Sequence, residues 1–142
     1  MSHSPTQMRH FAERLIAYDA RGIQSTPEKP VGFPVLAKLR HYLAALMGNM
    51  GFRSLLMRAL LLARVEVSVL RRLKVTATGV VDELEARADT KEIAEGRVVL
   101  VAHLLGLLVA LIGEVLVLRL IHEIWPRLPL KVYKEMPNEN KN

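Results

Sequence analysis

Residues 98–118 read VVLVAHLLGLLVALIGEVLVL, and most of these side chains are Leu, Ile or Val. No proline interrupts the run, and the sequence DTKE at residues 89–92 is typical of a capped helix start. Pro126 sets an end, because proline does not continue a helix. The pattern predicts one long helix near residues 91–125, apolar on all sides, which needs a protein interior or a membrane around it.

Three further segments show the spacing of apolar residues that is typical of amphipathic helices. The first begins at the capping sequence SPTQ, residues 4–7, and Gly22 can end it. The second is predicted over residues 34–47 and the third over about 52–73. The long helix could cover the apolar stripe of each. The predicted fold class is therefore all-α, a small helical bundle of four to five helices around one long apolar C-terminal helix. The stripe of the first helix consists of Met8, Phe11, Ala12, Leu15 and Ile16.

The third helix has a predicted inner face, but its C-terminal end can be read as helix or as extended chain. Valines occupy every second position from Val65 to Val69, and residues 74–78, KVTAT, resemble extended chain. A short strand or a frayed end is therefore an alternative there. Residues 81–88 are predicted to form a short acidic helix or helical turn. The predicted inner face consists of Leu55, Ala59, Leu62, Val69 and Leu73.

The chain is predicted to have four parts. Residues 1–22 form an amphipathic helix that could be an arm, because residues 23–33 hold the prolines and small polar residues of a linker. Residues 34–126 form the helical bundle domain. Residues 127–142, rich in Pro, Lys and Asn, form a mostly disordered tail.

The composition excludes several kinds of protein. The 142 residues contain no cysteine, which excludes disulfides, cysteine zinc sites and a cysteine nucleophile. Hydrophobic residues make up 51% of the chain and the mean hydropathy is +0.20, which is apolar for a domain with so limited an interior. We therefore expect an apolar surface that contacts a protein partner or a second copy of the chain in a homo-oligomer.

The charge distribution permits a polyanionic partner without requiring one. The net charge is +6 and the pI is near 10. Basic residues dominate residues 31–75 and acidic residues dominate residues 76–96, so the two blocks could neutralise each other within the fold. Arg53, Arg64 and Arg71 share one face and form a candidate basic patch. Because aromatic residues that would stack on bases are nearly absent there, nucleic-acid binding is a less favoured alternative.

Residues 98–118 are also long enough to cross a bilayer. Each Leu, Ile or Val favours insertion by about 0.3–0.6 kcal/mol, whereas Glu114 opposes it by up to about 3 kcal/mol. Basic residues are similar in number on the two sides, so no orientation is indicated. The segment from Met1 to Arg21 lacks the apolar run of a secretory signal. The cytoplasm is expected, and a single span at about 98–118 in an inner or plasma membrane is the alternative.

Small residues lie along one side of the long helix, and such residues let another backbone approach closely. They form a candidate helix-pairing face, either between two copies of the chain or against another helix of the same chain. This face consists of Ala102, Gly106, Ala110 and Gly113.

Three polar residues are expected to be buried: Glu66, His103 and Glu114. A carboxylate within an apolar helix must find a partner or take up a proton, and a salt bridge with an arginine such as Arg58 is the simplest solution. His103 and Glu114 project in nearly the same direction but lie about 16 Å apart along the axis. Only another helix or an antiparallel second copy could join them in one polar network.

No motif in the sequence indicates a reaction. The Glu-x-x-His pairs of helical metal sites, the Gly-x-Ser-x-Gly and His-Glu-x-x-His motifs and a phosphate-binding loop are absent. No metal, cofactor or small-molecule substrate is therefore expected. The predicted function is that of a non-enzymatic helical interaction or structural module, which binds a protein partner or itself.

Overall fold

The described part of the chain is helical apart from one short strand pair, which confirms the all-α class predicted from the sequence. The computed structural model describes residues 5–22, 34–75, 81–83 and 90–133. Its helices are α1 (Pro5–Gly22), α2 (Pro34–Glu66), the 3-10 helix η1 (Ser68–Arg72), α3 (Thr90–Ile112), α4 (Glu114–Ile124) and α5 (Leu130–Tyr133).

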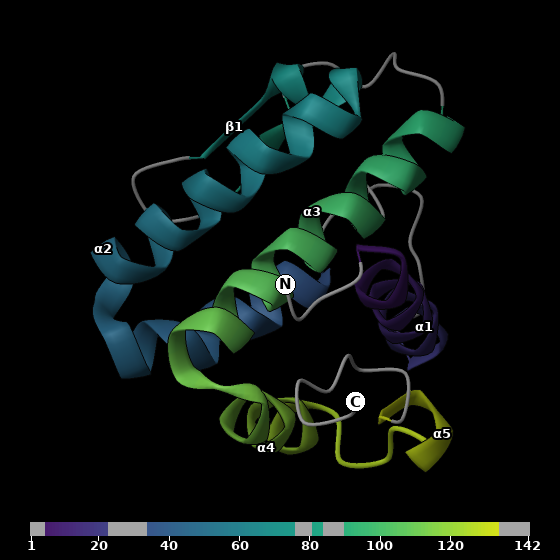
Figure 1. The fold of residues 1–142 in the computed structure, drawn as a ribbon, viewed down its shortest axis with the longest axis vertical. Helices are drawn as coiled ribbons and strands as arrows, with labels where there is room; N and C mark the ends of the chain where they lie inside the picture. The colour runs from purple at the N-terminus through teal and green to yellow at the C-terminus, as the bar shows by residue number, and fades with distance from the viewer. Residues whose placement is uncertain (1–4, 23–33, 76–80, 84–89, 134–142) are drawn as a thin grey trace.

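The apolar helix α3 lies at the centre of the arrangement (Figure 1). The second half of α2 runs along one side of α3, α1 lies on the other side, and the first half of α2 passes behind. α3 contacts α1, α2, α4 and η1, so its apolar side chains are covered from several directions. The buried ones are Val99, Leu100, Val101, Ala102, Leu104, Leu105, Leu108 and Val109.

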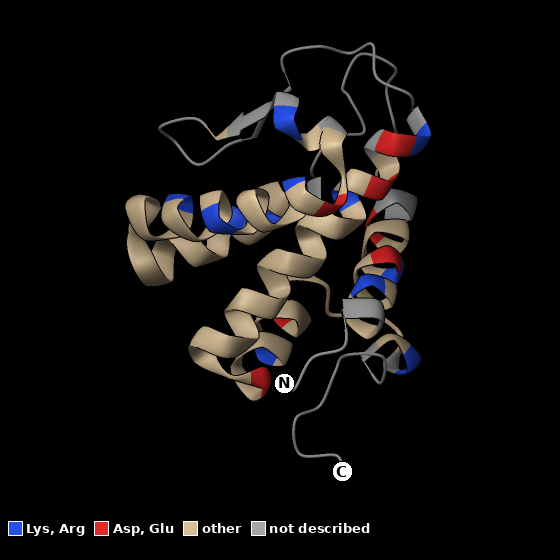
Figure 2. Cartoon of the chain, turned by 45° about the horizontal axis from the view of Figure 1, so that its top comes forward, with Lys and Arg blue, Asp and Glu red and all other residues tan. Residues whose placement is uncertain are grey.

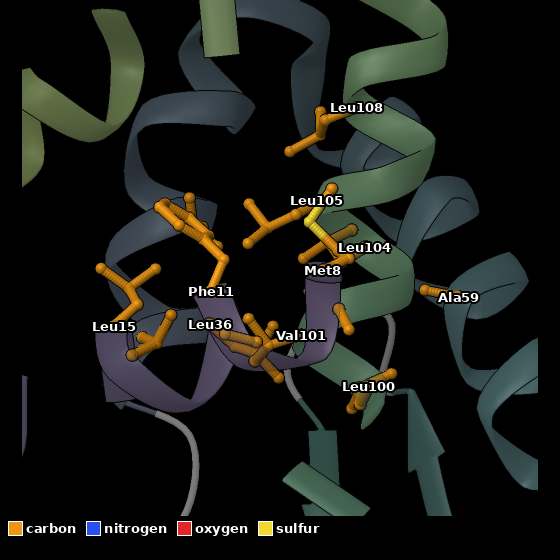
Figure 3. Close-up of a cluster of buried hydrophobic side chains, with 14 of the residues drawn as sticks. Met8, Phe11, Leu15, Leu36, Ala59, Leu100, Val101, Leu104, Leu105 and Leu108 are labelled. Carbon is orange, nitrogen blue, oxygen red and sulfur yellow. The ribbon is translucent and has the colours of Figure 1, made fainter. Parts of the chain in front are cut away.

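The helix α1 packs on α3 through side chains at helical spacing (Figure 3). Met8, Phe11 and Leu15 project from α1 into a cluster that Leu36 of α2 also joins. Phe11 and Leu15 are completely buried. α1 is thus part of the hydrophobic core. From α3 the cluster receives Leu100, Val101, Leu104, Leu105 and Leu108.

The helix predicted near residues 91–125 is not continuous, because α3 ends and α4 begins on either side of Gly113. Gly113 has φ 91° and ψ 155°, a combination that is essentially restricted to glycine. Its N–H donates to the carbonyl of Val109 over 2.9 Å, and the N–H of Val117 donates to the carbonyl of Gly113 over 3.2 Å. The glycine therefore redirects the chain without leaving these groups unpaired, and α4 turns away from the axis of α3 (Figure 1).

Replacing Gly113 with alanine is expected to lower the free energy of unfolding by about 1–2 kcal/mol, because a Cβ is strained at this φ. Space is not the obstacle, since no heavy atom lies within 4 Å of the position that the Cβ would take. Urea unfolding followed by circular dichroism measures the effect. Unchanged stability would contradict the assigned conformation of Gly113.

The long helix α2 contains a break and ends earlier than predicted. Gly48 has φ 80° and ψ 162°, close to the values at Gly113, and it separates the two helical segments that the sequence indicates. The predicted third helix over 52–73 is wrong at its end, because α2 stops at Glu66. η1 follows, and then β1 (Leu73–Val75) pairs antiparallel with β2 (Val81–Glu83). β-branched residues favour extended chain over helix, which accounts for the change.

Other sequence predictions for the connecting segments have mixed outcomes. Residues 81–83 form a strand rather than the start of an acidic helix, and residues 84–88 lie outside the described residues. The predicted linker 23–33 also lies outside them. After α4 the chain turns back, so that Leu128 and Val132 are buried and α5 contacts α1.

Candidate functional site

Large apolar side chains are exposed along the second half of α2. Met50, Met57, Leu61 and Val65 recur at intervals of seven and four residues, which places them on one side of the helix, and we call this set the α2 stripe. Val65 is 84% exposed and Met50 is 79% exposed. The other side of the same helix packs into the core through Phe52, Leu56, Ala59, Leu60 and Ala63.

This arrangement corrects the predicted inner face of the helix. Ala59 is buried and Leu55 is half-buried, but Leu62 is 42% exposed. The helix carries apolar residues on both of its sides, and the fold uses one of them.

Arginines flank the α2 stripe. At 100° per residue, Arg53 and Arg64 fall on one side of the stripe and Arg58 falls on the other. α2 contains no acidic residue before Glu66, and Figure 2 shows basic positions spaced along this helix. The flanks of the stripe are therefore positively charged.

The predicted basic patch is divided between two elements. Arg53 is half-buried, and its Nε has no hydrogen-bond partner among the described residues. Arg64 donates from Nε to the carbonyl of Leu70 over 3.3 Å, which ties the end of α2 to η1. Arg71 lies beyond the end of α2, in η1, and is exposed.

A second group of exposed apolar residues lies where α2 bends and where α3 meets α4. Leu46 precedes the bend at Gly48, and Leu111, Val115 and Leu116 surround Gly113. α2 contacts α4, and Figure 1 shows the bend of α2 and the α3–α4 junction on the same side of the molecule. We call Leu46, Leu111, Val115 and Leu116 the apolar corner.

Of the acidic block, Glu92 and Glu95 have side chains that the structure describes. Glu95 of α3 pairs with Arg9 of α1 across 3.7 Å. Glu92 is exposed in the first turn of α3. These two acids thus lie at the start of α3, where Glu95 balances α1 rather than the arginines of α2.

Two of the three polar residues singled out in the sequence lie together. The Nε2 of His103, in the middle of α3, is hydrogen-bonded to Oε2 of Glu66 at the end of α2. Both side chains are partly exposed, so neither is buried as expected, and the partner of Glu66 is a histidine rather than an arginine. At such exposure the pair contributes about 0–1 kcal/mol.

Glu114 lies apart from His103 and Glu66 and has a different explanation. It is the first residue of α4, directly after the break at Gly113, and it is half-buried. A carboxylate in the first turn of a helix interacts favourably with the unpaired N–H groups there, by about 0.3–1 kcal/mol. The break in the helix therefore accommodates Glu114 without a buried salt bridge.

Asp19 is the buried charged residue of the described chain, and sequence reasoning missed it. The side chain of Asp19 is 0% exposed. Lys38 Nζ of α2 donates to its Oδ1, and Trp125 Nε1, at the end of α4, donates to the same oxygen over 2.9 Å. Oδ2 has no partner among the described residues. A signal was present in the sequence, because Asp19 follows Leu15 by four residues on the apolar stripe of α1.

The predicted helix-pairing residues do not form one uniform face. Ala102 is buried, Gly106 is half-buried, Ala110 is exposed, and Gly113 ends the helix. A Cβ on Gly106 would meet nothing within 4 Å, so no backbone approaches it in the described structure. Close packing occurs instead at Gly96, where a Cβ would lie 2.8 Å from Cδ2 of Leu70.

The substitutions Gly96→Ala and Gly106→Ala are expected to have opposite effects on stability. A new methyl group at Gly96 displaces the buried Leu70, so overpacking outweighs the gain in helix propensity by about 1 kcal/mol. At Gly106 no neighbour is displaced, so the higher helix propensity of alanine is expected to raise the free energy of unfolding by about 0.5–1 kcal/mol. Parallel thermal melts measure both. A loss of stability at Gly106 would indicate a close helix contact there.

One helix of the described chain is long and apolar enough to cross a membrane. This candidate is Ala94–Ile112, with a mean hydropathy of 2.0, and half of it is buried inside the fold. The core helix of a soluble protein passes the same test. The predicted span 98–118 differs from this helix, because it extends past the break at Gly113. Among the described residues, no group of three His, Asp or Glu side chains could hold a metal ion.

Comparisons with known protein families, with curated proteins and with solved structures find no match to this chain.

Proposed function

We propose that this chain is a non-enzymatic interaction module of the cytoplasm whose docking face consists of the α2 stripe and the apolar corner. The observation that supports this is the concentration of large exposed apolar side chains on these two features. Single exposed leucines are ordinary on protein surfaces, whereas several large apolar residues along one side of a helix are typical of a contact surface.

The interior of the fold strengthens the proposal. The side of α2 opposite the stripe already packs into a core shared with α1 and α3. The stripe lies outside this core, and its four bulky apolar residues are exposed in the described fold.

The test replaces Met57, Leu61 and Val65 together with glutamine, a good helix former. The native protein is expected to enhance the fluorescence of an apolar dye while folded, and the triple variant is expected to lose most of this enhancement at unchanged melting temperature. A matched control replaces the exposed Ala17 of α1 with glutamine. Equal dye binding by the native protein and the triple variant would refute the docking face.

A second candidate is a membrane-anchored protein in which α3 crosses the bilayer, favoured by the hydropathy of Ala94–Ile112. It requires α3 to leave α1 and α2, with which it shares the core. Retention of the expressed protein in membranes after carbonate extraction would support this candidate over the first.

A further inference from the structure

We propose that the partner of the docking face is the surface of a bilayer of anionic phospholipids, which α2 contacts while lying parallel to it. This inference rests on the proposed function, because it names the partner of the same face. It differs from the span alternative, since α3 stays inside the fold and α2 makes the contact.

The residues along α2 have the pattern of a helix that lies in a membrane interface. The α2 stripe presents Met50, Met57, Leu61 and Val65 in one row, with arginines on both sides of it. A helix that lies in a membrane interface has an apolar strip bordered by Lys or Arg. Arginine suits the border, because its aliphatic stem lies along apolar surface while its guanidinium reaches the headgroups.

The positive charge beside the α2 stripe favours an anionic lipid surface. Arg53 and Arg58 lie beside the stripe, and the acidic residue of α2, Glu66, is engaged by His103. Anionic headgroups attract such basic segments. The face and the lipid surface are therefore complementary in charge as well as in polarity.

Other occupants match the docking face less well than a lipid surface does. Two copies of the chain that paired through the stripe would bring their arginines together, and α2 itself has no acid before Glu66 to neutralise them. A nucleic acid would neutralise the arginines but would leave the apolar centre of the stripe facing phosphates. A lipid surface accepts both the apolar row and its charged borders.

The apolar corner extends the contact at one end of the face. Leu111, Val115 and Leu116 are exposed around the α3–α4 junction, and Leu46 is exposed just before the bend of α2. Exposed aliphatic side chains at a helix junction can enter the interface beside the α2 stripe. Methionine, which is flexible, adapts to an irregular lipid surface.

The experiment is co-sedimentation of the full chain with vesicles. One set contains equal parts of phosphatidylcholine and phosphatidylglycerol, and the other contains phosphatidylcholine alone. Binding to the anionic vesicles is expected to be at least about tenfold tighter, and about 0.5 M salt is expected to weaken it. Equal binding to the two sets, or no binding to either, would overturn the proposal.

Variants separate the two components of the contact. Leu61→Gln with Val65→Gln is expected to weaken binding to anionic vesicles about tenfold or more, because apolar area is lost. Arg58→Gln is expected to weaken it about fivefold, whereas the matched charge control Arg127→Gln, exposed and outside α2, is expected to have less effect. Equal losses at Arg58 and Arg127 would show binding by net charge alone and would overturn the proposal. All four positions are exposed, and melting temperatures verify that the variants fold.

The dye measurement tests the docking face separately from its proposed membrane partner. Dye binding that depends on the stripe, together with absence of vesicle binding, would overturn the membrane partner and leave the docking face intact. Absence of stripe-dependent dye binding would overturn both. Insertion into neutral vesicles that resists carbonate would overturn surface docking in favour of the α3 span.

Discussion

Replacing Phe11 with alanine is expected to lower the free energy of unfolding by about 3–5 kcal/mol. Phe11 is completely buried in the hydrophobic cluster that joins α1 to α3 (Figure 3). Truncation removes the transfer free energy of the ring and leaves a cavity that packed neighbours fill only in part. For a domain with about 5–15 kcal/mol of total stability, this is a large fraction.

Urea unfolding followed by circular dichroism measures the loss, and the matched control is Glu13→Ala on the exposed side of α1. The control is expected to change stability by less than about 0.5 kcal/mol. The comparison also tests how the N-terminal helix docks. If α1 were an arm, Phe11 would be solvated, and both substitutions would have the same small effect.

The spacing of apolar residues correctly predicts the buried side of a helix where polar residues occupy the other side. α1 is amphipathic, and its predicted stripe is confirmed: Met8, Phe11, Ala12 and Leu15 are buried and Ile16 is half-buried. α3 carries apolar residues on all sides and the second half of α2 carries them on two opposite sides, so hydrophobicity alone does not tell which side faces inward. For this reason the periodicity places Leu62 in the core, and the sequence gives no distinct signal for the α2 stripe.

The breaks in the helices illustrate a second limit. Gly48 lies in a segment with a second glycine, so a break was indicated there. Gly113 stands alone in an aliphatic run, where glycine serves equally as a small packing residue or as a break. The acidic residue that follows, Glu114, is typical of a helix start, and it could have favoured the break.

Contacts between distant residues were the least predictable part of the candidate site. Glu66 and His103 were each recognised as polar residues in apolar helices, but their pairing joins α2 to α3 across 37 positions. Asp19 and Trp125 are 106 positions apart. Spacing along one helix says nothing about such pairs, because they depend on how the helices pack against each other.

Replacing Lys38 with methionine is expected to lower the free energy of unfolding by about 3 kcal/mol. The carboxylate of Asp19 is 0% exposed, whereas the side chain of Lys38 is 43% exposed. Without Lys38, Asp19 keeps only the hydrogen bond from Trp125 as a partner among the described residues. Breaking a buried ion pair in this way costs about 3–5 kcal/mol, and the exposure of Lys38 favours the lower end of that range.

Replacing Asp19, the other member of the ion pair, is expected to lower the free energy of unfolding by less. In Asp19→Asn the amide oxygen can still accept from Trp125, and the ammonium group of Lys38 can turn to water because it lies near the surface. We expect a loss of about 1 kcal/mol, typical of one hydrogen bond made weaker. Removing both charges in the double variant relieves the isolated carboxylate, so its loss is expected to be smaller than that of Lys38→Met alone.

A double-mutant cycle in urea provides the measurement, with Lys131→Met as a matched control, since Lys131 is exposed. Asp19 connects α1, α2 and the end of α4 through one oxygen atom, so its charge is held by elements that meet only in the folded chain. Additive effects of the two substitutions would show that Lys38 and Asp19 act independently. A double variant that loses less free energy of unfolding than Lys38→Met alone would show that Lys38 is needed because Asp19 is buried.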